Sequence, residues 1–397
     1  MKAVGVIVAT VLAILLVVVV VVPVIEDSMH NAGPDVRTSW EYDDYRPLTP
    51  DVISCTGALE TVTVGGTAYI HAKDVGQGTI VRSDWSVQTV DVGKAVLDLI
   101  YIDGQSNAAQ NTEDLETAPV PALGTAYYFG SESRYAEAGR INSQETLDAA
   151  LTNQLGTWSF QTMLDSDGAL KIGDKAPGIA KTYCENTGHR VYIVDGAVPG
   201  SPVRYHIPQS TETVTNWSWQ WAEAVVAKAL ESVDDSLFEI VYTGIDLWLQ
   251  GESDANQSTA AYLKYWKLYR TGAVEGGLGI PIDTIVVCLI ANVTDENGTV
   301  NAALISLTQE FDDTVLGASA AGFTVEGGEL NPEDSLHYTQ AGDNIIGEEW
   351  GKTAARIVLE NRNAEDMSVK DILVQFIPLL LILVAMAFLV TAFGHRR

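Results

Sequence analysis

The sequence contains few cysteines and few histidines. Of its 397 residues, three are cysteine and six are histidine. Cys55, Cys184 and Cys288 form neither a CxxC pair nor the Cys/His spacing of a zinc site, so we expect no metal and no cofactor. Cys288 lies inside an apolar run and is expected to be a buried thiol. Cys55 and Cys184 are candidates for a disulfide if the domain is exported, although spacing alone cannot bring them together.

Basic residues are also scarce. There are 23 lysines and arginines against 52 acidic residues, which gives a formal net charge of -29. A surface of this sign repels phosphate backbones and anionic lipid head groups, which argues against nucleic acid as a partner. The acidic excess indicates a soluble surface and does not indicate a particular fold.

Two long apolar runs lie at the ends of the chain, at residues 4–22 and 372–393. Each is long enough to cross a bilayer as a helix. We therefore expect an N-terminal transmembrane anchor over 1–25 and a C-terminal transmembrane helix over 371–393. The alternatives are a cleaved signal peptide for the first run and a buried helix of a soluble domain for the second.

The charges beside these runs predict a topology. Lys2 precedes the first run, and Arg396 and Arg397 stand in the tip, 394–397, behind the second. Basic residues remain on the cytoplasmic side of a membrane. We therefore expect both termini to be cytoplasmic, the membrane to be a partner through two helices, and the main domain to be extracytoplasmic.

Between the two runs the pattern changes three times. Residues 26–59 are polar and are expected to form a stalk, 60–95 alternate in polarity and predict a small β-rich subdomain, and 362–370 form a linker. From 96 to 361, short apolar strands alternate with amphipathic helices, which predicts a doubly wound parallel sheet flanked by helices. The expected strands are 96–102, 190–194, 239–249, 284–291 and 322–325, and the expected helices are 175–186, 217–233 and 258–269.

Three polar strings follow predicted strands or stand in a late loop. The string from Asp103 to Asn107 reads Asp-Gly-Gln-Ser-Asn and places Ser106 at a strand-to-helix turn. Such a turn exposes a hydroxyl beside helix N–H groups, although the same string is also an ordinary turn and N-cap. Because ligands bind outside the carboxyl ends of parallel strands, a residue here is well placed for chemistry.

The other two strings carry acidic groups. Trp-Leu-Gln-Gly-Glu-Ser-Asp, ending in Glu252 and Asp254, indicates a buried polar network, and no histidine accompanies it for metal binding. Asp334 and His337 stand three residues apart in a late loop. This spacing can place the carboxylate against one imidazole nitrogen and leave the other free to take a proton from a serine, although alone it is also typical of an exposed loop.

Together the three strings resemble the SGNH-hydrolase superfamily, and specifically its sialate O-acetylesterase and acetylxylan esterase branch, carbohydrate esterase family six. The resemblance covers roughly residues 96–361 and implies an SGNH or flavodoxin-like fold. It implies that Ser106 is the nucleophile, His337 the base and Asp334 the residue that orients His337. The residues implied to support the site are Gln105, Asn107, Glu252 and Asp254.

The resemblance also implies an oxyanion hole made by the Ser106 N–H, the Gly200 N–H and the Gln250 amide. Such donors stabilise the charge that develops on an ester carbonyl. Two positions depart from the family pattern: Pro199 replaces the first glycine of a Gly-Gly string, and Leu249 precedes Gln250 where an aromatic residue or histidine is common.

The expected function is a membrane-anchored serine O-acetylesterase that acts on acetylated extracellular carbohydrate, such as sialic acid, xylan or an envelope glycan. A non-catalytic carbohydrate-binding or adhesive protein, and a purely structural envelope protein, are the alternatives. Trp217, Trp219 and Trp221, three of the nine tryptophans, are candidates for stacking against sugars, although most tryptophans are expected in the core. Oligomeric state and sugar are not determined by the sequence.

Overall fold

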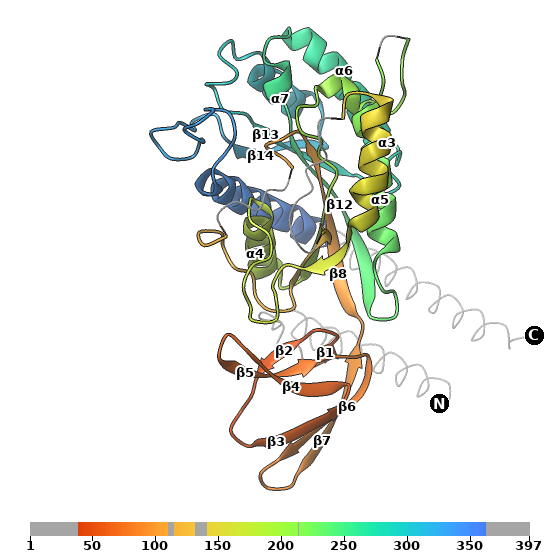
Figure 1. The fold of residues 1–397 in the computed structure, drawn as a ribbon, viewed down its shortest axis with the longest axis vertical. Helices are drawn as coiled ribbons and strands as arrows, with labels where there is room; N and C mark the ends of the chain where they lie inside the picture. The colour runs from red at the N-terminus through yellow and green to blue at the C-terminus, as the bar shows by residue number, and fades with distance from the viewer. Residues whose placement is uncertain (1–38, 110–114, 132–140, 213, 363–397) are drawn as a thin grey trace, which may run out of the picture. The chain divides into compact units, whose positions relative to one another are not determined.

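The computed structural model describes residues 39–109, 115–131, 141–212 and 214–362 (Figure 1). The chain divides into two compact units, Ser39–Ile357 and the remainder, Met1–Thr38 with Val358–Arg397. All strands and helices α3 to α7 belong to the first unit.

The larger sheet has seven strands in the order β10-β9-β11-β8-β12-β13-β14. All neighbouring pairs are parallel except β10 with β9, which is antiparallel. The strands are β8 Ala95–Gly104, β9 Ala126–Gly130, β10 Ser159–Thr162, β11 Arg190–Asp195, β12 Phe238–Leu249, β13 Thr284–Leu289 and β14 Thr314–Ser319.

Helices cover both faces of this sheet, with α3 and α5 on one side and α4 and the C-terminal helix over 340–362 on the other (Figure 1). Cover on both faces explains why β11 is buried along its whole length. The helices are α3 Gln144–Asn153, α4 Ala176–Thr187, α5 Trp217–Glu231, α6 Thr259–Val274 and α7 Thr299–Glu310. Short 3₁₀ turns are Leu155–Thr157, Val203–His206 and Glu252–Asp254.

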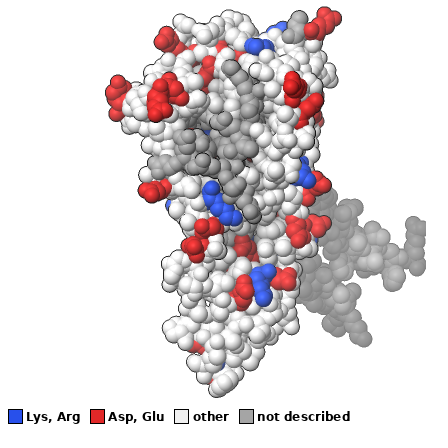
Figure 2. Space-filling view, viewed as in Figure 1, with Lys and Arg blue, Asp and Glu red and all other residues white. Residues whose placement is uncertain are grey.

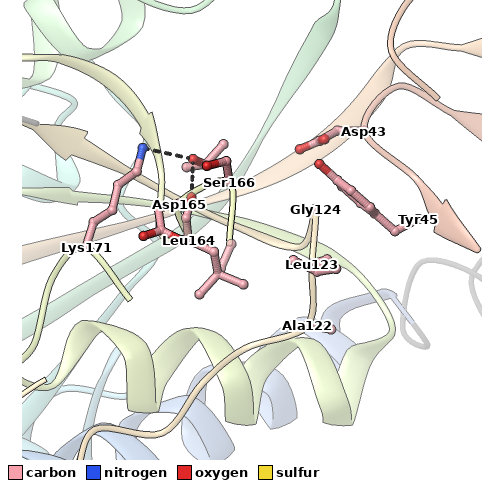
Figure 3. A pocket seen from close by; sticks show the side chains of 11 residues that line it. Asp43, Tyr45, Ala122, Leu123, Gly124, Leu164, Asp165, Ser166 and Lys171 are labelled. Carbon is pink, nitrogen blue, oxygen red and sulfur yellow. Dashed lines mark hydrogen bonds between the residues drawn. The ribbon is translucent and has the colours of Figure 1, made fainter. Parts of the chain in front are cut away.

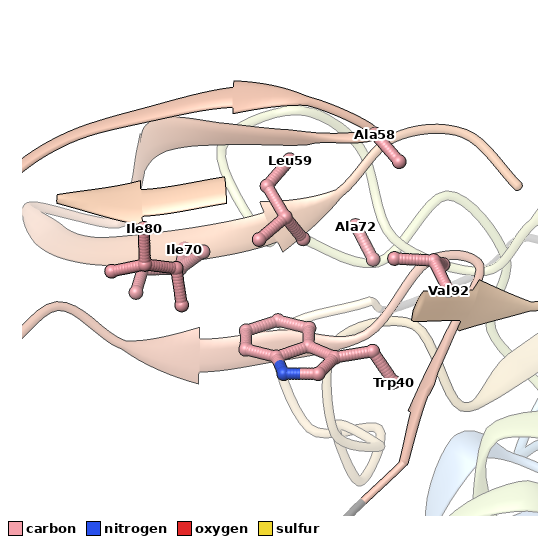
Figure 4. Close-up of a cluster of buried hydrophobic side chains, with 7 residues drawn as sticks. All are labelled: Trp40, Ala58, Leu59, Ile70, Ala72, Ile80 and Val92. Carbon is pink, nitrogen blue, oxygen red and sulfur yellow. The ribbon is translucent and has the colours of Figure 1, made fainter. Parts of the chain in front are cut away.

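Residues 40–93 form a small β region built from two sheets. One has the order β1-β7-β6-β3 and the other β2-β5-β4. Their strands are β1 Trp40–Glu41, β2 Tyr45–Pro47, β3 Val52–Gly57, β4 Leu59–Val64, β5 Thr67–Ala72, β6 Gly76–Arg82 and β7 Val87–Gly93. The sheets share a core of Trp40, Ala58, Leu59, Ile70, Ala72, Ile80 and Val92 (Figure 4). This core explains the alternating pattern of the segment.

The fold class expected from the sequence needs correction. The sheet is mixed rather than wholly parallel, because β10 joins its edge in the opposite direction, where only one neighbour constrains it. Residues 40–57, expected in a stalk, form β1 to β3. The last strand is Thr314–Ser319 and not 322–325.

The transmembrane helices expected at each end are not part of the observed fold. Within the described ranges, no helix combines the length and the apolar character needed to cross a bilayer. The two segments to which these helices were assigned, 1–25 and 371–393, lie outside the described residues. The topology and the membrane location inferred from them remain predictions.

Candidate active site

Three neighbouring strands end at one edge of the large sheet and bring the predicted residues together. Ser106 follows β8, the turn with Gly200 follows β11, and Gln250 follows β12, and β8 lies between the other two. In a doubly wound sheet, a crevice opens outside the carboxyl ends of two neighbouring strands where the chain leaves them toward opposite faces of the sheet. Residues that are far apart in the sequence therefore lie close together in space.

A glycine lets the Ser106 turn approach its neighbour strand. Gly104 has φ of 143°, and a Cβ there would overlap the carbonyl oxygen of Leu249 at the end of β12. Only glycine fits such a close approach. The N–H of Gln105 donates to the same carbonyl at 3.1 Å, which fixes the turn against β12.

Ser106, His337 and Asp334 form a continuous chain of contacts. Ser106 Oγ lies 3.1 Å from His337 Nε2, and His337 Nδ1 lies 2.7 Å from Asp334 Oδ2. Both distances are within the reach required for proton transfer and for orienting an imidazole. The side chains of His337 and Asp334 are 45% and 39% exposed, so the base stands at an open surface.

The loop of Asp334 and His337 is held by its own backbone. Asn331 donates to the His337 carbonyl and Ser335 donates to the Asn331 carbonyl, both at 2.8 Å. Asp334 Oδ1 accepts the N–H groups of Leu336 and His337 at 2.9 and 3.0 Å. Ser335 has φ of 55°, an uncommon value for a residue other than glycine. The surrounding bonds hold this turn and set the carboxylate against the ring.

These bonds also control the charge of Asp334. Partial burial alone would raise its pKa, but the hydrogen bonds from the His337 ring and from two backbone N–H groups outweigh it, and the pKa is lowered. Asp334 is therefore an ionised acceptor throughout the range in which histidines titrate.

Glu252 holds both neighbours of the serine. Its carboxylate accepts Gln105 Nε2 at 2.5 Å and Asn107 Nδ2 at 2.6 Å. Burial raises the pKa of Glu252, although the hydrogen bond from Asn107 opposes this. Gln105 Oε1 in turn accepts the N–H of Ser253 at 3.2 Å. Of the predicted supporting residues, these three thus surround the Ser106 turn directly.

Two backbone N–H groups are available as oxyanion donors. Within the described part of the chain, neither the Ser106 N–H nor the Gly200 N–H donates a hydrogen bond. Gly200 adopts φ of 67°, so the Pro199 substitution leaves a glycine turn in place. The turn is tied to the nucleophile turn, because the Val198 N–H donates to the Gly104 carbonyl at 3.0 Å.

Gln250 differs from the expectation. Its amide is fully buried and donates to the Ser201 carbonyl at 3.1 Å and to Asp254 Oδ2 at 2.5 Å. Both amide hydrogens are therefore engaged, so the structure makes Gln250 a brace rather than a third free donor. Asp254 also accepts the Val203 N–H at 2.7 Å, which links the brace to the Gly200 loop.

A buried polar chain that the sequence analysis missed lies behind the Gly200 loop. Ser201 Oγ lies 2.7 Å from His206 Nε2, and His206 Nδ1 lies 3.2 Å from Asp103 Oδ1, close enough for an ion pair but without the alignment of a hydrogen bond. All three residues are at most 1% exposed. Burial excludes substrate, so this chain can only position the loop. No sequence motif marks His206.

A buried lysine supports the other side of the nucleophile turn. Lys175 Nζ donates to the Ala108 carbonyl at 3.3 Å and pairs with Asp174 at 3.0 Å and with Asp343 at 3.7 Å. Despite burial, the two carboxylates raise the pKa of Lys175, which keeps it charged. From the sequence, Lys175 is expected only to begin a helix.

The structure also contains a hollow away from the predicted site residues. A hollow of about 240 Å³ lies between Asp43 and Tyr45 of the small β region and the segment of Asp165 and Lys171 (Figure 3). None of the predicted site residues lines it. Among the described residues, no cluster of three or more histidines, cysteines and carboxylates forms a metal site.

The cysteines and tryptophans are also placed. All three cysteines are free thiols, so Cys55 and Cys184 do not pair in this structure, and Cys288 is buried. Trp219 and Trp221 belong to the core, and Trp217 packs edge-on against Tyr205. The tryptophans named from the sequence as candidates for stacking are thus largely occupied by packing.

Comparisons with known proteins give a distant likeness only. No family model and no curated protein matches the sequence. A protein from Arabidopsis thaliana is 17% identical with a TM-score of 0.42, covering 67% of this chain and 99% of that one. NanS is 12% identical with a TM-score of 0.43, covering 67% and 98%. A carbohydrate acetylesterase from Xanthomonas citri is 13% identical with a TM-score of 0.41, covering 80% and 72%. Likeness at this level does not assign an activity.

Proposed function

We propose that the protein is a serine carboxylic-ester hydrolase that removes acetyl groups from carbohydrate. The observation that carries the proposal is the contact chain from Ser106 Oγ through the His337 ring to Asp334, with distances of 3.1 and 2.7 Å. A serine hydroxyl is a weak nucleophile until a neighbouring base takes its proton. The geometry supplies that base and the group that orients it.

The reaction follows from these positions. His337 Nε2 takes the Ser106 proton as Oγ attacks the ester carbonyl, and the oxyanion is stabilised by the N–H groups of Ser106 and Gly200. His337 then returns the proton to the departing sugar oxygen, which breaks the ester bond and leaves acetyl-Ser106. His337 then takes a proton from water, which attacks the acetyl carbonyl; the bond to Ser106 Oγ breaks, His337 returns the proton to Oγ, and acetate is released.

The substrate class rests on the three motif strings and on the openness of the site. Their resemblance to carbohydrate esterases of family six favours a small acyl group on a sugar. The exposure of His337 and Asp334 favours a bulky substrate that approaches from solvent. Acetylated sialic acid, xylan and an envelope glycan are all compatible with this arrangement.

The test is turnover of p-nitrophenyl acetate and release of acetate from acetylated xylan and acetylated sialic acid. Ser106→Ala should abolish both, by on the order of 10⁶-fold as for other serine nucleophiles. Ser253→Ala is the matched control, because this exposed serine lies in the adjacent loop and contributes only its backbone N–H. A wild-type protein that releases no acetate, or an active Ser106→Ala variant, would disprove the proposal and favour a non-catalytic carbohydrate-binding protein.

A further inference from the structure

One face of the four-stranded sheet in the small β region is open to solvent. The strand register places alternate residues of β6 and β7 in the core, including Ile80 and Val92, and the others on the opposite side. We call this opposite side the outer face. Its residues are Ser54, Thr56, Gln77, Thr79, Val81, Val87, Thr89 and Asp91. All of them are exposed or half-buried.

The hairpin that joins β6 to β7 carries an unusual tryptophan. Trp85 is 78% exposed and has φ of 63°, a conformation that a bulky residue rarely adopts. In the described part of the chain, its indole makes no ring contact, cation–π contact or hydrogen bond. Trp85 therefore combines an exposed apolar side chain with a strained backbone, and the packing of the fold requires neither. Strain of this kind is found at functional sites.

The hairpin is rigidly held in spite of this strain. Arg82 donates to the Ser86 carbonyl and Trp85 donates to the Arg82 carbonyl, at 3.0 and 2.9 Å. Asp84 accepts the N–H and the hydroxyl of Ser86 at 2.9 and 2.6 Å. The Arg82 side chain pairs with Asp51 at 2.5 Å and so ties the hairpin to the turn directly before β3. The backbone that carries the indole is thus held by hydrogen bonds, which lowers the entropic cost of ordering the hairpin on binding.

We propose that Trp85 and the outer face bind an uncharged polysaccharide chain. The proposal stands beside the esterase activity and does not require it. An exposed indole offers a flat apolar surface for the C–H face of a sugar ring. The outer face adds four hydroxyl groups and one amide as hydrogen-bonding partners, and Asp91 is its single charge.

Charge decides between possible partners. Arg82 is neutralised by Asp51, so the surface offers no unpaired cation to an anionic polymer or lipid head group. The chain as a whole carries a net charge of -29, which repels nucleic acid and acidic membranes.

The site would act at a distance from the nucleophile. β8 begins at Ala95, directly after the small β region, and ends at Gly104 beside Ser106. At about 3.3 Å per residue this strand separates its two ends by on the order of 30 Å. Binding at the outer face would therefore hold the enzyme on a polymer and leave hydrolysis of a small soluble ester unchanged.

The experiment is co-sedimentation of the full chain with microcrystalline cellulose, insoluble xylan and chitin, in a Ser106→Ala background that prevents turnover. We expect retention on at least one polymer, weakened about ten-fold or more by Trp85→Ala, the loss typical of truncating an aromatic anchor. Tyr242→Ala is the control, because Tyr242 is an aromatic residue 44% exposed on β12, outside the outer face. It should bind as the parent does.

A second variant separates binding from folding. Glycine adopts a φ of 63° without strain, so Trp85→Gly should lose retention while its thermal midpoint rises by about a degree or more. Measured with Ser106 intact, both Trp85 variants should hydrolyse p-nitrophenyl acetate at the parental rate. Absence of retention on all three polymers, equal retention of Trp85→Ala, or retention on anionic lipid vesicles instead would overturn the proposal. Retention by a protein that shows no esterase activity would disprove only the esterase proposal.

Discussion

Asn107 joins the nucleophile turn to the loop of the base. Its side-chain amide donates to Glu252 at 2.6 Å and to the Leu336 carbonyl at 3.1 Å, and its carbonyl accepts the Tyr338 N–H at 3.2 Å. The residues on both sides of His337 are therefore held by the residue next to Ser106. A site assembled from positions more than 200 residues apart depends on such cross-links, because hydrogen-bond reach leaves little tolerance.

At the residue scale, the pH dependence should show a single proton. The pKa of Asp334 is lowered, so its carboxylate remains ionised while histidines change charge between about pH 5 and 8. We expect kcat/KM for p-nitrophenyl acetate to fall in acid with a slope of one, because Asp334 stays ionised and adds no second proton. Any stability that Asp334 contributes should be present above its unfolded-state pKa and be lost only as pH falls through the lower folded value.

Variants of His337 and Asp334 check this assignment. Asp334→Asn should reduce kcat by on the order of 10⁴-fold, and His337→Ala by on the order of 10⁶-fold, because the base itself remains in the first variant. Equal losses, or an acid limb with a slope of two, would mean that Asp334 takes part in proton transfer.

A second prediction at the residue scale concerns the buried Ser201. Removing its hydroxyl breaks the 2.7 Å contact with His206 Nε2 beside the Gly200 turn. Losing a whole oxyanion donor costs about 10² to 10³-fold in kcat, and a displaced donor should cost less. We therefore expect Ser201→Ala to lower kcat about ten-fold, with KM unchanged and slower labelling of Ser106 by a fluorophosphonate.

The control is Ser232→Ala, which removes a hydroxyl hydrogen bond of 2.8 Å at the end of α5, away from the site. Both variants should lose some stability, but only Ser201→Ala should lose kcat. A purely structural role for Ser201 would lower stability and leave kcat and labelling unchanged.

At the scale of elements, one arginine connects the large sheet to the small β region. Arg190, the first residue of β11, donates to Glu41 and to Asp44, the latter at 2.5 Å, and to the Gly124 carbonyl at 2.7 Å. Its side chain is only 4% exposed. Tyr127 of β9 adds a hydrogen bond of 2.6 Å to Asp43. The residues around β1 and β2 are thus fastened to the start of the sheet strands.

Breaking this connection should be costly. Arg190→Met removes the buried cation that pairs with Glu41 and Asp44, and removing one partner of a buried ion pair costs about 3 to 5 kcal/mol. Urea unfolding should show this loss. Lys267→Met, which breaks the exposed pair with Glu310 at 2.6 Å, is the control and should cost under about 1 kcal/mol. Similar losses in the two variants would show that Arg190 is not a structural link.

At the scale of the whole molecule, the acidic excess should make stability depend on salt. Acidic side chains are spread over the view in Figure 2, and the few basic ones mostly lie beside them. With a net charge of -29, repulsion among carboxylates opposes folding and is screened as ionic strength rises. We expect the thermal midpoint to rise between about 0.01 and 0.1 M NaCl, where the Debye length falls from about 30 to 10 Å.

KCl should give the same rise, because screening depends on ionic strength and not on the cation. A midpoint that stays constant or falls would show that local ion pairs, such as those of Arg190, outweigh the global repulsion.

Much of the site could be predicted from short strings of residues. Ser106, His337 and Asp334 each stand in a local pattern, and the alternation of strands and helices implies that strand ends share one edge. Strands β8, β11, β12 and β13 of the large sheet were likewise predictable, because a short apolar run between two helical segments is best explained as a buried strand. The small β region was predicted in part, since polar residues before 60 concealed β1 to β3.

Only the tertiary structure decided which side chains pair. Glu252 and Asp254 stand two residues apart, yet one holds the Ser106 turn and the other holds Gln250 and the Gly200 loop. The roles of Ser201 and His206 can be recognised only once the structure places them beside Asp103, about a hundred residues earlier. Trp85 stands out only through its backbone angle and its exposure. The physical reason is that periodicity and turn chemistry are local properties, whereas hydrogen-bond partners depend on strand register and packing between distant segments.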